Sequence, residues 1–106
     1  MSYRPTRLLC VGNEADLLQT RCAVLRHAGY YAQAASLTDA EILLSTEKYD
    51  LVIISAGLSE WDRGRILLAA GKTPTHILRG VTFALELLAQ VERLLSPVKQ
   101  TASRKD

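Results

Sequence analysis

The stretch YDLVIISAGLS, residues 49–59, constrains the fold more strongly than any other part of the sequence. Its four apolar residues, Leu51 to Ile54, follow one another without a polar interruption, and Ser55 closes the run before the small-residue turn Ala56-Gly57. A short continuous apolar run is typical of a strand that is buried on both faces, as strands of parallel sheets are. The run therefore predicts a central parallel strand that delivers one polar side chain, Ser55, to the edge of the sheet.

Strand and helix signals alternate along the rest of the chain. Short apolar or alternating runs bounded by glycine, proline or serine predict strands over 7–12, 30–36, 50–55 and 74–80. Segments with apolar residues three and four positions apart, opened by capping residues and closed by glycine or proline, predict helices over 14–29, 36–49, 59–71 and 81–96. This alternation indicates an α/β fold with a parallel sheet and right-handed crossovers.

Composition places the chain among ordinary globular domains, with 48% hydrophobic and 23% charged residues in 106. We expect one domain over 1–96 and a polar tail over 97–106, because Pro97 breaks the last helix. The sequence has no apolar run of about 18 residues, so we expect no membrane span. A net charge of +2 is too small to indicate nucleic-acid binding.

The two cysteines and two histidines show no metal-ligand spacing, so we expect no metal site. Cys10 lies within an apolar run and Cys22 on an apolar helix face, where each is most simply a small buried hydrophobe. Unpaired cysteines of this kind favour a reducing, cytoplasmic location.

Three stretches match one known family in order and spacing: LLCVGNEADLLQTRCAVLRHAGYYAQAAS, AEILLSTEKYDLVIISAGLSEWD and LELLAQVERLLS. With them, residues 7–96 resemble the receiver domains of two-component response regulators. Members of that family have a loop after the first strand, a helix ending in Gly-Tyr, Tyr-Asp-Leu-Val-Ile before the phosphoacceptor, and an amphipathic final helix. The resemblance implies a role in signal transduction by phosphorelay.

The chemistry of that family needs two acidic residues after the first strand and an acceptor aspartate after the third, all around Mg²⁺. The corresponding positions here are Gly12, Asn13 and Ser55, and only the next residue, Glu14, is acidic. A serine hydroxyl without an adjacent base is a poor nucleophile. The resemblance therefore predicts a degenerate pseudo-receiver that is not an enzyme, with no catalytic residue and no cofactor.

The end of the chain departs from the family as well. Arg79 stands where the fourth strand should end in Thr or Ser, and about 20 residues of helix and strand are missing before the last helix. In an alternative register, residues 74–80 replace the fifth strand of the family. Arg79 is then either a contact for an anion or switch, or a solvent-facing cation.

Together these points predict a flavodoxin-like or receiver-like three-layer α/β/α sandwich with a four-stranded parallel sheet in the order 2-1-3-4. Right-handed crossovers place the first helix on one face and the second and third helices on the other. The last helix, with its stripe Phe83, Leu87, Val91 and Leu94, should lie beside the first, as in the family.

Each candidate residue also has a simpler structural interpretation. In this interpretation, Ser55 is a small polar residue whose hydrogen bonds are satisfied at the end of a strand. Asn13-Glu14 then serve to cap the first helix. Trp61 either packs against the rim of the sheet or is an exposed anchor for a partner.

Two functions fit the sequence. The first is a receiver-like signalling module that acts through protein–protein interaction without aspartyl phosphotransfer. The alternative is a small-ligand or anion-binding module that uses the rim at the carboxyl ends of the strands. The loop GNEAD has neither a dinucleotide-binding nor a Walker pattern, which argues against a nucleotide.

The fourth strand is expected to form an exposed sheet edge if the fifth strand is absent. Pro74 and Arg79 protect its ends, while Ile77 and Leu78 between them carry no charge. We favour a homodimer through this edge over a monomer or a different protein partner.

Overall fold

The computed structural model of the chain describes residues 6–78 and 84–95, and the expectations for Arg79 and for the tail lie outside them. The strands are β1 (Arg7–Val11), β2 (Tyr31–Ala35), β3 (Leu51–Ile54) and β4 (Thr75–Ile77). The helices are α1 (Ala15–His27), α2 (Leu37–Thr46), α3 (Glu60–Ala70) and α4 (Ala84–Leu95).

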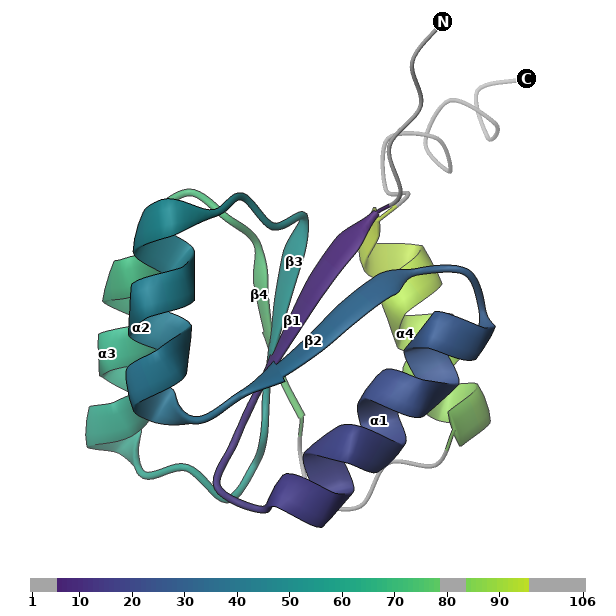
Figure 1. Cartoon of the computed structure of the whole chain (residues 1–106), viewed down its shortest axis with the longest axis horizontal. Coiled ribbons are helices and arrows are strands. Elements are labelled where there is room, and N and C mark those ends of the chain that lie inside the picture. The colour runs from purple at the N-terminus through teal and green to yellow at the C-terminus, as the bar shows by residue number, and fades with distance from the viewer. Residues whose placement is uncertain (1–5, 79–83, 96–106) are drawn as a thin grey trace, which may run out of the picture.

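The four strands pair in parallel in the order β2-β1-β3-β4, which confirms the predicted topology. Helices α1 and α4 cover one face of the sheet, and α2 and α3 cover the other (Figure 1). The last helix therefore lies beside the first, where Leu87 and Val91 of its predicted stripe are buried. Leu94 is 37% exposed, and Phe83 lies outside the described residues.

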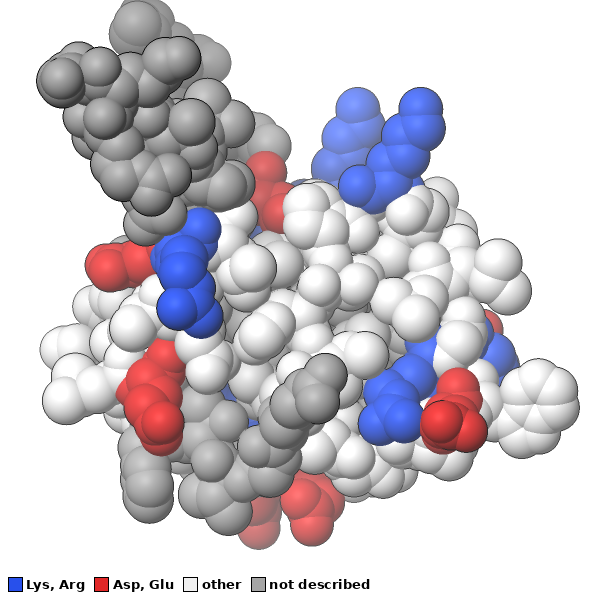
Figure 2. Space-filling view, turned by 180° about the vertical axis from the view of Figure 1, so that it is seen from behind, with Lys and Arg blue, Asp and Glu red and all other residues white. Residues whose placement is uncertain are grey.

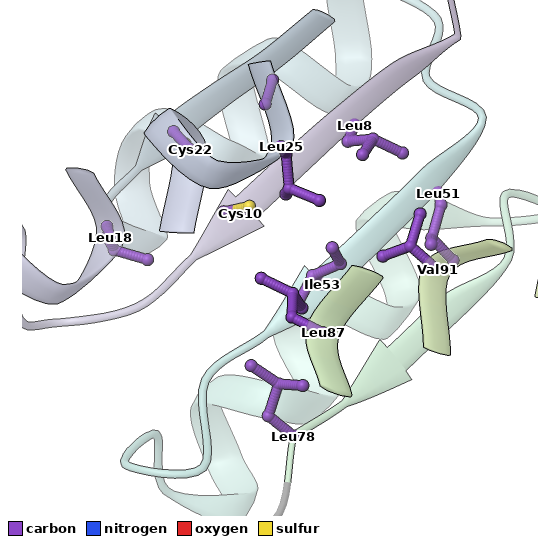
Figure 3. Packing of buried hydrophobic residues seen from close by; sticks show 11 residues of the cluster. Leu8, Cys10, Leu18, Cys22, Leu25, Leu51, Ile53, Leu78, Leu87 and Val91 are labelled. Atoms are coloured by element: carbon purple, nitrogen blue, oxygen red, sulfur yellow. The ribbon is translucent and has the colours of Figure 1, made fainter. Parts of the chain in front are cut away.

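The alternation of side chains along the strands divides the core into two clusters. Leu8 and Cys10 of β1 face α1 and α4 and belong to the same cluster as Leu25 of α1 and Leu87 and Val91 of α4 (Figure 3). Residues that follow them by one position, such as Leu9, pack on α2 and α3 instead. Successive residues of a strand point to opposite faces of the sheet. The position of a residue along its strand therefore decides which pair of helices its side chain can contact.

Helices α2 and α3 begin at capping serines, whereas the cap expected for α1 is corrected. The side chains of Ser36 and Ser59 accept hydrogen bonds from the backbone N–H groups of Asp39 and Asp62, which start α2 and α3. Glu14 is the N-cap residue of α1, but its side chain makes no capping hydrogen bond. The expectation that Asn13-Glu14 cap this helix through a side chain is therefore wrong for Glu14. Its backbone carbonyl instead accepts a hydrogen bond from the N–H of Leu18.

Strand β4 is shorter than predicted, with three residues rather than the segment 74–80. Its backbone pairs with β3, and His76 Nε2 lies 3.1 Å from Gln90 Oε1 of α4. This contact joins the edge strand to the last helix. In the described part of the chain, no helix is both long and apolar enough to cross a membrane.

Candidate functional site

Ser55 lies directly after β3 and is buried. Its backbone N–H donates to the Val11 carbonyl at 2.9 Å, so the chain is still held beside β1 at this point. Since Ile54 faces α2 and α3, the next side chain is expected on the α1 side. The strand therefore delivers the Ser55 hydroxyl to the first helix.

Gly12 lies after β1 and packs against Ser55. A Cβ atom added to Gly12 would lie 2.4 Å from Ser55 Oγ and 2.9 Å from Ser55 Cβ. The same atom would be 3.3 Å from Leu18 Cδ2 of α1. The position that carries an acid in the resembling family therefore has no room here for any side chain unless Ser55 moves.

Arg21 of α1 completes the site, and the sequence analysis did not single it out. Its Nη1 donates a hydrogen bond to Ser55 Oγ at 2.7 Å. The residue is only 6% exposed. The site is thus a buried guanidinium held against a serine hydroxyl, next to a glycine.

Among the described residues, no neighbouring acid compensates the charge of Arg21. The ion pairs in the described residues join Arg7 to Glu47 and Arg65 to Glu41, and neither includes Arg21. Its Nε is a buried nitrogen without a hydrogen-bond partner. An arginine keeps its positive charge in proteins, so this pocket holds a buried cation with one neutral acceptor.

The spacing of α1 could have indicated Arg21. The buried residues of this helix are Leu18, Arg21, Cys22 and Leu25. They follow the three- and four-residue spacing of one helix face, so Arg21 occupies a sheet-facing position. In the sequence, the apolar residues alone mark this stripe, and a charged residue at position 21 is predicted only to flank it.

Asn13 and Glu14, the other two positions of the expected acidic pocket, are exposed at the start of α1. Asn13 borders a depression of about 180 Å³ beside Gly12, Ser36 and Asp39. Glu14 borders a second depression with Asp16. Neither lining includes Ser55 or Arg21, so the structure does not gather the expected acidic positions around the hydroxyl.

These residues do not fit Mg²⁺, the metal that the resemblance implies. Mg²⁺ takes oxygen ligands, usually carboxylates, and here a guanidinium lies against the acceptor-position hydroxyl. Residues 6–78 and 84–95 also contain no group of three His, Cys, Asp or Glu side chains placed to hold a metal.

The two cysteines are free and fully buried, as predicted. A hydrogen bond with the Cys10 thiol lowers the pKa of Cys22 to about 7. The same hydrogen bond, with burial, raises the pKa of Cys10. Both side chains belong to the core cluster under α1 and are not presented to solvent.

The expected interface residues divide into three kinds. Trp61 of α3 is 86% exposed, which excludes packing against the sheet rim and leaves the partner anchor as a prediction. Ile77 is partly buried against the cluster beneath α2 and α3. Leu78 is 1% exposed within the core, so its side chain is not available to a partner and that expectation is wrong.

Comparison with known proteins supports the fold and leaves the chemistry open. No protein-family model matches the chain, and no curated protein matches it in sequence. It is similar in structure to a response regulator receiver domain protein (CheY-like) from Methanospirillum hungatei JF-1, with a TM-score of 0.67 and 15% identity, covering 92% of this chain and 99% of that one. It is also similar to a receiver domain (CheY-like) from Methylobacillus flagellatus, with a TM-score of 0.65 and 17% identity, covering 84% and 98%. By fold, the chain is a receiver-like domain.

Proposed function

We propose that this chain is a signalling module that has kept the receiver fold, acts through protein–protein contacts and does not carry out aspartyl phosphotransfer. The receiver-like fold of CheY-like domains supports the signalling role. Free buried cysteines support a cytoplasmic setting.

The Arg21–Ser55 hydrogen bond is the observation that carries this proposal. Phosphotransfer in the family needs a carboxylate that attacks phosphorus and a metal that neutralises the transferred group. Here the hydroxyl at the acceptor position accepts from a guanidinium, and no described acid lies within ion-pair distance of Arg21. Within residues 6–78 and 84–95, the side chain hydrogen-bonded to this hydroxyl is Arg21, which cannot take its proton.

The chain is therefore expected to remain unmodified when it is incubated with Mg²⁺ and acetyl phosphate. Intact mass spectrometry at neutral pH, with an active receiver domain treated in parallel, measures this directly. An adduct of one phosphoryl group per chain would contradict the proposal.

The Ser55→Asp variant serves as a control for the residue type at the acceptor position. It restores the acceptor carboxylate but leaves Gly12 and Asn13 in the acidic positions. We expect the new carboxylate to pair with Arg21 and to remain unphosphorylated, because the metal ligands are still missing. If the variant is phosphorylated while the unmodified chain is not, the residue at the acceptor position is the only feature that prevents phosphotransfer.

A second copy of the chain is the partner that we propose for the β4 edge. The N–H of Val52 donates to the Pro74 carbonyl, and the N–H of Leu78 donates to the Ile54 carbonyl. In a parallel pair the residues that bond to the neighbour alternate along the strand, so the backbone groups of Thr75 and Ile77 point away from β3. No described strand lies on that side.

The surface around this edge suits a symmetric contact. Figure 2 views the molecule from the β4 side and shows a described surface that is mostly uncharged in its middle, with charged side chains toward the margins. In a two-fold dimer the same patch meets itself, so a neutral patch avoids like-charge repulsion. Trp61 and Leu68, seven residues apart on one face of α3, form a separate pair of exposed apolar side chains on the helix that precedes β4.

Thr75→Pro is expected to weaken dimerisation by about five- to 150-fold. Proline removes an N–H that points outward, and two-fold symmetry removes it twice, at about 0.5–1.5 kcal/mol for each hydrogen bond. Sedimentation equilibrium across a tenfold range of concentration measures the association. Because Ile77 is partly buried, Thr75 is the cleaner position for this test.

Thr75→Val is the matched control, since it keeps the N–H and the strand propensity. It should dimerise like the unmodified chain. The fluorescence of Trp61, the only tryptophan, should shift to the blue on association if α3 borders the interface. A monomer mass that persists at every concentration would exclude the second copy while leaving a different protein partner in place.

A further inference from the structure

We propose that Cys10 and Cys22 are a redox-sensitive thiol pair that a small peroxide converts into a disulfide within the chain. The bond would tie the middle of α1 to β1, and thiol reductants would break it again. This inference goes beyond the signalling role proposed above and does not depend on it.

The path of α1 over β1 places the two cysteines opposite each other. Leu18 packs at the carboxyl end of β1, since its Cδ2 lies 3.3 Å from the place of a Cβ atom added to Gly12. Because β1 and β2 are parallel, the helix that connects them runs back along β1. Four residues of a helix and two residues of a strand each span about 6 Å, so Cys22 comes over Cys10.

Both thiols are fully buried in the same core cluster. Figure 3 shows Cys10 on the strand and Cys22 on the helix that covers it. The two sulfur atoms are close enough to share a hydrogen bond. A disulfide joins its sulfur atoms at about 2 Å, which is shorter than any contact between unbonded atoms. The bond therefore needs no cavity in this packed core.

Cys22 is the reactive member of the pair. The hydrogen bond from Cys10 and the nearby charge of Arg26 lower the pKa of Cys22 to about 7, against the effect of burial. The thiolate is the form of cysteine that attacks an oxidant. Helix α1 is an outer layer of the molecule (Figure 1), and Ala23 and Arg26 beside Cys22 are exposed. A brief local opening of this one turn is enough to admit a molecule as small as hydrogen peroxide.

Oxidation by hydrogen peroxide takes two balanced steps. The Cys22 thiolate attacks one peroxide oxygen, the O–O bond breaks, and the departing hydroxide takes up a proton to become water. The Cys10 sulfur then attacks the sulfur of the sulfenic acid formed on Cys22. The S–O bond breaks, and hydroxide leaves with the Cys10 proton as a second water. The two thiols lose two electrons, and one peroxide molecule gains them.

The disulfide would act on the part of α1 that carries Arg21. This residue precedes Cys22 and donates from Nη1 to Ser55 Oγ at 2.7 Å. A bond from Cys22 to β1 fixes the same helix turn, so oxidation should be reported at Ser55. Disulfides that form and break in this way are the kind found in reducing compartments.

Mass spectrometry of the folded chain tests the bond directly. Treatment with one equivalent of hydrogen peroxide in native buffer should lower the intact mass by two hydrogen atoms, and dithiothreitol should restore it. Trypsin cuts after Arg21, which separates residues 8–21 from residues 22–26. Without reductant, these two peptides should be recovered as one linked species, and a non-reducing gel should show a chain that remains monomeric.

The double variant Cys22→Ala, Ala23→Cys is the matched control. It keeps two cysteines and moves the second by one position, from the buried face of α1 to an exposed one. The link between the two peptides should be at least tenfold less abundant in this variant. Equal abundance would overturn the proposal, because the bond would then not depend on how α1 packs over β1.

The thermal midpoint shows whether the bond fits the fold. Oxidation should raise the midpoint by about 10 °C or more, because the disulfide constrains the unfolded chain. The ¹⁵N-labelled chain should show a shift of the Ser55 amide after oxidation. A lower midpoint, a sulfinic acid on Cys22 without a link, or a link that forms only after urea unfolds the chain would each overturn the proposal.

Discussion

Replacement of Gly12 by alanine is expected to destabilise the fold by about 1–3 kcal/mol, the usual cost of overpacking a well-filled interior. The new Cβ would lie 2.4 Å from Ser55 Oγ and 2.9 Å from Ser55 Cβ, and both are too close for unbonded atoms. Ser55 cannot move away freely, because its backbone N–H bonds to Val11 and its hydroxyl bonds to Arg21. Urea unfolding followed by circular dichroism measures the loss.

The cause of that loss can be isolated in a second variant. Ser55→Gly removes both atoms that clash, so the double variant Gly12→Ala, Ser55→Gly should recover most of the stability lost by Gly12→Ala relative to Ser55→Gly alone. Gly64→Ala is the matched control, since a Cβ added there meets no atom within 4 Å and alanine is the better helix former. Equal losses at Gly12 and Gly64 would contradict the close packing at the site.

Replacement of Arg21 by methionine is expected to stabilise the fold by about 1–3 kcal/mol. Buried ionic groups exchanged for apolar residues of similar size often raise stability, and this one lacks a described counter-charge. Ser55→Ala should have the opposite effect and lower stability by about 1–3 kcal/mol, because it leaves the buried guanidinium without its acceptor. Urea unfolding in a buffer free of phosphate and sulfate gives both values.

The double variant decides whether the two effects share one cause. Once Arg21 is methionine, the Ser55→Ala change should cost much less than it does in the unmodified chain, since no charge remains to be satisfied. Two results would contradict this account: a loss of stability in Arg21→Met, or an equal cost of Ser55→Ala in the two backgrounds. Either would show that the buried charge of the guanidinium is compensated.

The candidate site was predictable in part. The positions of Gly12 and Ser55 after two buried strands were enough to expect them at one rim, because parallel strands end at a common edge. Their close packing was not predictable, since it depends on the strand register, which leaves only 2.4 Å between Ser55 Oγ and the place where a Cβ of residue 12 would lie. The same is true of Leu78, which reads as an edge residue in sequence but turns into the core.

The sequence by itself determined the order of the elements, the parallel sheet and the faces on which the first three helices pack. These follow from side-chain periodicity and crossover handedness, which are properties of the local chain. Only the tertiary structure decided what the Ser55 hydroxyl at the acceptor position contacts. Arg21 and Ser55 are 34 residues apart in the sequence. The spacing of residues along α1 predicts which face Arg21 occupies, but it does not predict which residue its long side chain contacts. The hydrogen bond exists because the end of β3 and the sheet-facing stripe of α1 meet in space, and that meeting is a property of the assembled layers.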